Sequence, residues 1–378
     1  MNILCPHFTL CSGCSLNIQV DQLPLIEEAR SFFREKGTDA FPLTTGAPCG
    51  WRYRAKLAVR GSVEYPILGL FEKGSHQAVD IPECRVHHPA INKAAACLRL
   101  WIRDHGIIPY NEATGSGDLR YVQMTVEMST GQVQLVLVFN HRPEVAKQKF
   151  ESTGALLMQG SDLWHSIWFN SNQRRDNVIF GEGWSFICGQ EWLWQTFCDL
   201  PICFHPASFF QANPEMYEAL LRQIQRSVPQ QASVVEFYAG AGVIGLTLAE
   251  QSKRVCCVEV VPLAECCFNK SYERQPLSIQ EKLSFIRGTS AAQIARLKPP
   301  ATVVVVDPPR KGLEPELLNA LCATTSVEVL VYVSCGWSGF KRDCEALLKG
   351  GWKLNKAEGF LFFPGSDHLE VLAVFEKI

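Results

Sequence analysis

Long apolar runs, low-complexity segments and internal repeats are all absent from this sequence of 378 residues. Its longest apolar stretches have the size of strands, whereas a helix that crosses a bilayer needs about 20 such residues. The start, MNILCPHFTLCSGC, also lacks the basic and apolar blocks of a signal peptide. We therefore expect a soluble, cytoplasmic protein that does not bind membranes and, at this length, has two domains.

An excess of basic residues is missing too, since 36 Lys and Arg stand against 38 Asp and Glu, a net charge of −2. Proteins that bind nucleic acid through charge alone are usually basic, so any RNA contact here must come from a local patch. The stretch WRYRAKLAVR (51–60) is one candidate, because in a strand its basic residues share one face: Arg52, Arg54, Lys56 and Arg60. A solvated charged strand face is the alternative. Arg174 and Arg175 form a weaker candidate.

Cysteine is abundant, with 16 residues, and a reducing compartment argues against eight disulfides. Most of them are expected to be small core residues. Cys5, Cys11 and Cys14 differ because they form a C-x5-C-x2-C spacing, and Cys84 follows in DIPECRVHHP. Four cysteines that converge in the fold suit a tetrahedral zinc or an iron–sulfur cluster. His7, His87 and His88 could also serve a zinc ion, so the spacing leaves the metal open.

The two halves of the chain have different patterns. From about residue 201, apolar strand-like runs (234–237, 254–260, 301–307 and 329–335) alternate with helix-length segments, which predicts a doubly wound parallel sheet. LEVLAVFEKI (369–378) is expected to pair antiparallel at an edge of that sheet. The first half shows one helix, from about Leu23 to Lys36, and otherwise alternating stretches typical of antiparallel strands. The sequence thus predicts an α/β protein: a smaller, mostly antiparallel β domain (1–200) before a Rossmann-like domain (201–378).

The segment VVEFYAGAGVIGLTLAE (234–250) has the pattern of a strand, a glycine-rich turn and a helix. Gly240, Gly242 and Gly245 form G-x-G-x-x-G, which lets a ligand approach the backbone closely. Glu259 ends the next strand, nineteen residues after Gly240, where a carboxylate accepts hydrogen bonds from ribose hydroxyls. The pattern predicts binding of NAD or S-adenosylmethionine, with close helix packing alone as the plainer alternative.

VVVVDPPRKG (303–312) favours S-adenosylmethionine. Asp307 lies at the carboxyl end of a buried strand, the edge at which doubly wound sheets bind ligands. Two prolines make the following turn extended and rigid. Such a turn resembles those of nucleic-acid methyltransferases. Enzymes that methylate exocyclic amines usually have an aromatic residue next, whereas this chain has Arg310, which argues against amine methylation.

Methylation of carbon needs different groups. C5 of a pyrimidine becomes nucleophilic when a thiolate adds to C6, and a base must later remove the C5 proton. Cys335 ends the strand that follows the Asp307 strand, and Glu370 lies at the start of the last strand. A buried structural thiol and an exposed strand-end carboxylate are the alternatives for these two residues.

Three motifs together resemble the S-adenosylmethionine-dependent RNA uracil-C5 methyltransferases: SCGW (334–337), DPPRKG (307–312) and HLEV (368–371). The resemblance extends from Cys5 to Glu370. It implies a class I methyltransferase domain with Cys335 as nucleophile and Glu370 as the base. The cofactor positions that match are Gln211, Tyr238, Glu259 and Asp307, beside Gly240 of the turn. Gly336 departs from the family, which usually has asparagine there, and Tyr238-Ala239 replaces its usual Phe-Cys.

The resemblance also bears on the cysteines and the substrate. Cys5, Cys11, Cys14 and Cys84 match the ribosomal RNA branch of the family, in which four cysteines hold a [4Fe–4S] cluster; the transfer RNA branch generally lacks them. We therefore expect a monomeric enzyme that methylates C5 of a uridine in 23S rRNA. Methylation of tRNA, cytosine-C5 methylation and a catalytically silent, metal-stabilised RNA-binding protein are the alternatives. The target nucleotide is not encoded in any motif.

Overall fold

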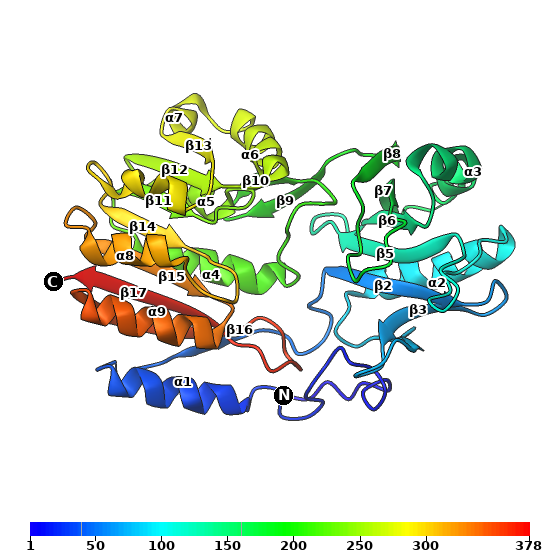
Figure 1. Ribbon diagram of the computed structural model, residues 1–378, viewed down its shortest axis with the longest axis horizontal. Coiled ribbons are helices and arrows are strands. Elements are labelled where there is room, and N and C mark those ends of the chain that lie inside the picture. Colours follow the sequence, from blue (N-terminus) through cyan, green and yellow to red (C-terminus); the bar gives the residue numbers. More distant parts are fainter. Residues whose placement is uncertain (39, 160) are drawn as a thin grey trace.

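The computed structural model describes residues 1–38, 40–159 and 161–378, and is built around two β-sheets that lie side by side (Figure 1). A seven-stranded sheet comes from the first half of the chain, and an eight-stranded sheet comes mainly from the second half. No helix in the described ranges combines the length and apolar character required to cross a membrane.

The seven-stranded sheet has the order β4-β3-β2-β5-β6-β7-β8. Its strands are β2 (Arg54–Gly61), β3 (Pro66–Phe71), β4 (Ala78–Asp80), β5 (Leu119–Val126), β6 (Val133–Phe139), β7 (Trp164–Ser171) and β8 (Gly183–Gly189). All neighbours are antiparallel except β6 and β7, which are joined by the crossover helix α3 (Pro143–Leu156). Helix α2 (Pro89–Asp104) buries its apolar side against this sheet, in one core with Leu57 and Val122.

The eight-stranded sheet has the order β1-β16-β17-β15-β14-β11-β12-β13. Its strands are β1 (Leu43–Thr45), β11 (Ser233–Phe237), β12 (Arg254–Glu259), β13 (Leu283–Arg287), β14 (Val303–Val306), β15 (Val329–Ser334), β16 (Trp352–Leu361) and β17 (Glu370–Lys377). Five neighbouring strands of this sheet run parallel to one another: β13, β12, β11, β14 and β15. Strand β17 is antiparallel to both of its neighbours, β15 and β16. From β11 the chain first adds β12 and β13 on one side and then adds β14 and β15 on the other side, so the direction in which strands are added reverses at β11. Doubly wound sheets bind ligands at such a switch point, outside the carboxyl ends of the strands.

Helices cover both faces of the eight-stranded sheet. Val234 of β11 packs with α4 (Pro214–Ser227), α5 (Val243–Leu248) and α6 (Pro262–Glu273). Its neighbour Val235 points the other way, towards α1 (Pro24–Glu35), α8 (Pro315–Ala323) and α9 (Trp337–Lys349), which lie along one side of the sheet in Figure 1. The remaining elements are the hairpin β9 (Leu193–Phe197) and β10 (Leu200–Phe204), α7 (Leu277–Gln280) and a 3-10 helix (Ala291–Leu297). Burial on both faces explains why the parallel strands have continuous apolar sequences.

The four predicted parallel strands and the predicted first helix are confirmed, within one or two residues at their ends. The expectation of a single helix in the first half is wrong, because α2 and α3 also lie there. The edge position of the last strand is wrong, because β16 and β1 lie beyond β17. Helix α1 and strand β1 pack on the eight-stranded sheet although they precede the seven-stranded one. The division into two domains at residue 200 therefore stays a prediction. Helix α1 and strand β1 do not follow it, since they lie before residue 200 and pack with the second sheet.

Candidate active site

The glycine-rich turn between β11 and α5 faces the switch point. Tyr238 and Gly240 both have positive φ, at 61° and 53°. A Cβ at Gly240 would meet nothing within 4 Å, so the backbone is open to a ligand there. A Cβ at Gly245 would lie 2.7 Å from Glu236 Oε2, which accepts a hydrogen bond from Gly245 N at 2.9 Å. Gly245 thus lets α5 pack against the buried carboxyl group of Glu236, and Gly240 leaves room for a ligand.

Glu259 supports the same turn from the end of β12. Its carboxylate accepts hydrogen bonds from the backbone N–H groups of Gly240 (2.9 Å), Val260 (2.8 Å) and Val261 (3.0 Å). These bonds fix the carboxylate beside the open turn. A carboxylate at this place in the fold is suited to binding ribose hydroxyls.

A narrow cavity of about 50 Å³ brings together four of the predicted cofactor residues. Gln211, Tyr238, Gly240 and Asp307 line it, while Glu259 lies just outside and holds Gly240. The other lining residues are mostly apolar and aromatic: Phe197, Phe204, Phe209, Phe210, Tyr217, Glu236, Ala239, Ala241, Val243 and Ile244. Apolar walls with a few convergent polar groups are typical of cofactor sites.

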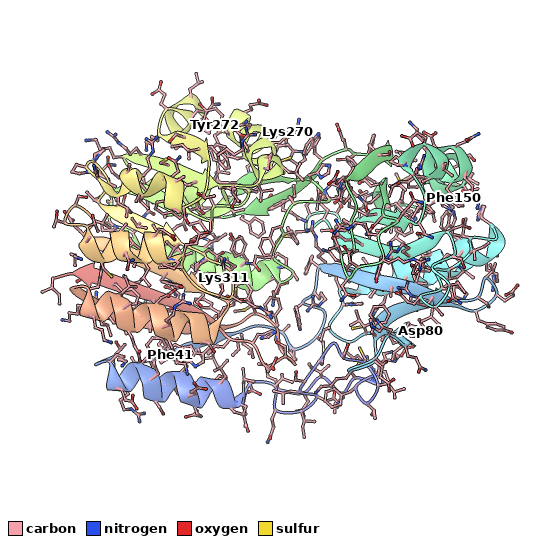
Figure 2. The ribbon with its side chains drawn as sticks, in the orientation of Figure 1. Phe41, Asp80, Phe150, Lys270, Tyr272 and Lys311 are labelled. Carbon is pink, nitrogen blue, oxygen red and sulfur yellow. The ribbon has the colours of Figure 1, made fainter. Side chains whose placement is uncertain are left out.

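Cys335, Glu370 and Asp307 lie at the same edge of the sheet. Cys335 directly follows Ser334, which pairs with Val371 in the antiparallel β15–β17 ladder, and Glu370 directly precedes Val371. Cys335 and Glu370 are thus the next opposing positions. Asp307 follows the last residue of β14, which runs parallel to β15. Figure 2 shows Lys311, in the loop after Asp307, on the side of the eight-stranded sheet that is nearer to the middle of the molecule.

Burial perturbs all three acids. It raises the pKa of Asp307 to about 7. Burial, and then the neighbouring Asp307, raise the pKa of Glu370 to about 8. Burial, followed by the charges of Glu370 and Asp307, raises the pKa of the Cys335 thiol to about 11. Arg310 acts in the opposite direction on Cys335 and Glu370. A cluster of acids with shifted pKa values is typical of catalytic sites.

A wider cleft of about 390 Å³ adjoins the cofactor cavity. One side carries Arg310 and His368, whose Nη2 and Nε2 atoms are 3.0 Å apart. Phe209, Phe210 and Gln211 line both the cleft and the cofactor cavity, so they separate the two. Phe209 is 71% exposed, which is unusual for a large aromatic residue. From the sequence, Arg310 was considered only because an aromatic residue was missing there, and Phe209 was overlooked. The one indication of Phe209 in the sequence was its position two residues before Gln211.

The four predicted metal ligands line another cavity, of about 140 Å³. Cys5, Cys11, Cys14 and Cys84 surround it together with side chains that include His7, His87 and Arg52. Burial and then the neighbouring thiols raise the pKa of Cys14 to about 12. Among the residues that the structure describes, no group of three or more Cys, His, Asp or Glu side chains is arranged to hold a metal ion. The structure thus places the four cysteines around one cavity but does not show a metal centre.

The cysteine loop also forms part of the cleft. Ser12, Gly13 and Ser15, which lie next to Cys14 in the sequence, line this cleft together with Arg310. Ser15 N donates to the carbonyl oxygen of Gly365 at 2.6 Å, in the turn that precedes Glu370. The loop that carries three of the four thiols is thereby attached to the segment that carries Glu370.

Similar proteins identify the family. The chain is 42% identical to an uncharacterized RNA methyltransferase of Protochlamydia amoebophila, over 99% of this chain and 97% of that protein. It is 30% identical to an uncharacterized RNA methyltransferase of Enterococcus faecalis, over 97% of this chain and 80% of the relative. The chain belongs to the RNA methyltransferases.

Solved structures support the fold of this methyltransferase. The crystal structure of Pyrococcus abyssi tRNA (uracil-54, C5)-methyltransferase, in complex with S-adenosyl-L-homocysteine, superposes with a TM-score of 0.77. The two sequences are 24% identical, and the match covers 97% of this chain and 86% of the other. The Rossmann-like methyltransferase fold is therefore shared. No family model matches the sequence.

The predicted basic stripe on β2 is wrong for this RNA methyltransferase. Arg54 is only 8% exposed, and its Nη1 donates to the carbonyl oxygen of Ser208 at 2.6 Å. Arg60 is 7% exposed and forms an ion pair with Glu112. The segment around Ser208, between β10 and α4, covers a strand face that was expected to be solvated. Arg52 is the one member of the stripe that lines the cleft, and Lys56 is exposed.

Proposed function

We propose that this RNA methyltransferase transfers a methyl group from S-adenosylmethionine to C5 of a uridine, through a covalent bond between Cys335 and C6. The observation that carries the proposal is the convergence of Cys335, Glu370 and Asp307 at the sheet edge. The open glycine turn lies at the same edge, and a cleft adjoins the cofactor cavity. A catalytically silent RNA-binding protein would not require this set of buried acids.

The reaction begins at the Cys335 sulfur. As a thiolate it forms a bond to C6 of the uracil, and the electron pair of the C5–C6 double bond moves towards O4. C5 would then accept the methyl group, while the bond between that methyl group and the sulfonium sulfur would break and its electron pair would stay on the sulfur of S-adenosyl-L-homocysteine. Glu370, as a carboxylate, removes the C5 proton, the C5–C6 double bond forms again, and the C6–sulfur bond breaks to release the thiolate. Arg310 is the cation that favours the charged forms of both Cys335 and Glu370.

The residues present fit S-adenosylmethionine. Glu259 is held where ribose hydroxyls would bind, and Gly240 leaves backbone space beside it. Gln211 and Asp307 supply polar groups within an otherwise largely apolar cavity. When bound, the cofactor supplies the methyl group and a positive sulfonium charge, which favours the ionised forms of the acids around it.

The four thiols surround one cavity, as the ligands of an iron–sulfur cluster would. A tetrahedral zinc with Zn–S bonds of about 2.3 Å needs sulfurs roughly 3.8 Å apart around one point. Cys5, Cys11, Cys14 and Cys84 instead surround a cavity and form no such ion site among the described residues. A [4Fe–4S] cluster, in contrast, fills a space between four thiolates. We propose that these cysteines hold one, with a structural role, because methyl transfer consumes no electron.

The proposed substrate is 23S rRNA, and its support is the cysteine set. The related Pyrococcus enzyme acts on tRNA. Its 24% identity establishes a common fold only, so a tRNA uridine remains the alternative substrate.

A trapping experiment tests the chemistry. RNA transcribed with 5-fluorouridine cannot lose a C5 proton, so the adduct should persist after methyl transfer. We expect a protein–RNA complex that resists denaturation, forms only with S-adenosylmethionine, and maps to Cys335 by mass spectrometry. A complex attached at another cysteine would refute the assigned nucleophile.

A further inference from the structure

Gly336, directly after the nucleophile, has no room for a side chain. A Cβ there would lie 2.1 Å from the Arg310 carbonyl oxygen and 2.6 Å from the Arg310 Cα. Both atoms belong to the backbone, so no side-chain rotation could relieve the clash. Its φ of −132° is ordinary for any residue, which leaves packing as the reason for glycine at this position.

A second glycine repeats the contact one helical turn later. A Cβ at Gly339 would lie 2.8 Å from the Arg310 carbonyl oxygen and 2.7 Å from Gly312 N. The far side of the same loop is fixed by Asp343, whose Oδ2 accepts a hydrogen bond from Leu313 N at 2.7 Å. The Arg310–Gly312 loop therefore rests directly on the first turn of α9, the helix that begins beside Cys335.

This packing determines where the Arg310 side chain begins. From its seat against Gly336, Arg310 reaches His368 Nε2 at 3.0 Å, two residues before Glu370. Its charge acts on both Cys335 and Glu370. The guanidinium thus lies among the groups that must ionise during the proposed reaction.

We propose that Gly336 is a positioning residue, which seats the Arg310 backbone against α9 and so holds the Arg310 guanidinium beside Cys335 and Glu370. The inference rests on the proposed function, since it assigns a purpose to Arg310 in the same site. Glycine is required at this position of the chain, because the Arg310 backbone occupies the space that a side chain would fill.

The Cys335 thiol reports the position of Arg310. Asp307 and Glu370 face it and raise its pKa, whereas Arg310 lowers it. The nearby Asp367 and His368 line the cleft with Arg310. Withdrawal of an opposite charge changes a pKa by about 1 to 3 units, so thiolate at a fixed pH should fall about tenfold or more.

The test measures the rate at which iodoacetamide alkylates Cys335 in the full-length protein at pH 8 and pH 9, by mass spectrometry of the Cys335 peptide. Both pH values lie well below the pKa of about 11, so the rate is proportional to the fraction of thiolate. The test needs neither RNA nor cofactor, so its failure differs from failure of the methyl-transfer proposal. Gly336→Ala and Arg310→Met should each slow alkylation at pH 8 and pH 9 about tenfold. Gly339→Ala, with a milder clash, should act in the same direction and serves if Gly336→Ala does not fold. Gly46→Ala is the control, because its Cβ would meet only the flexible Met216 side chain.

The double variant separates positioning from other effects. With Arg310→Met already present, Gly336→Ala should slow alkylation no further, because the charge it displaces is gone. A wild-type alkylation rate in folded Gly336→Ala would overturn the proposal. Rate losses that multiply in the double variant would also overturn it, because Gly336 would then act independently of Arg310.

Discussion

Replacement of Glu370 by Gln should stop the reaction after methyl transfer and leave RNA bound to Cys335. Glutamine preserves the shape of the side chain but cannot accept the C5 proton. Loss of a positioned base typically slows a step by about 10²- to 10⁴-fold. Formation of the adduct needs Cys335 and is expected to continue, so the complex should accumulate.

The pKa of Glu370 gives this prediction a pH dependence. Burial and Asp307 raise that pKa to about 8. At pH 7 about one-tenth of the side chains are therefore ionised, and elimination by the wild-type enzyme should speed up about tenfold from pH 6 to pH 7. Above pH 8 the rate should level off, since most of the base is then ionised.

Single-turnover reactions with end-labelled RNA, resolved on denaturing gels, measure both formation and decay of the adduct. Glu358→Gln is the matched control, because Glu358 is likewise a buried carboxylate on a strand next to β17 but pairs with Lys356 instead. Normal turnover by Glu370→Gln, or an elimination rate that does not change between pH 6 and pH 8, would refute the assignment of the base.

Three further predictions concern the nucleophile, the buried carboxyl group and the cysteine cavity. Cys335→Ala should abolish methyl transfer and adduct formation while cofactor binding, measured by calorimetry, remains; residual methylation would remove Cys335 from the mechanism. Burial raises the pKa of Glu236 from 4.5 to about 8, so the folded state holds its proton more tightly than the unfolded state. The free energy of unfolding should therefore fall as pH rises from about 4.5 to 8, by on the order of 4 kcal/mol from this group. Glu236→Gln should reduce that slope in urea unfolding at pH 5 and 8, and an unchanged slope would contradict the role of burial. Cys84→Ser should remove the visible absorbance and the iron of anaerobically purified protein, whereas stoichiometric zinc without iron in the wild type would exclude the cluster.

Local sequence predicted the parts of the fold that depend on local patterns. The apolar runs of β11, β12, β14 and β15 became parallel strands because helices cover both of their faces. The glycine-rich turn and its neighbour Glu259 were also predictable, because a turn and the end of the next strand are recognised from short stretches of sequence. The carboxyl-edge rule also placed Asp307 and Cys335 together, since parallel strands end at one edge.

Features that depend on distant contacts were not predictable in this way. Arg54 and Arg60 alternate like a solvated strand face, but a segment about 150 residues later covers Arg54. The position of β17 inside the sheet depends on β16, whose mixed polar sequence did not indicate a strand. The importance of Gly336 appeared only when the Arg310 backbone was found against it.

The central claim is uridine-C5 methylation, and one methyl-transfer assay tests it most directly. Anaerobically purified protein would be incubated with labelled S-adenosylmethionine and total RNA from cells that lack 5-methyluridine, and the labelled nucleoside identified and mapped. The account predicts label as 5-methyluridine in 23S rRNA. The same product in tRNA would retain the mechanism and contradict the proposed substrate. Label in any other nucleoside, or none from protein that binds the cofactor, would contradict the chemistry itself.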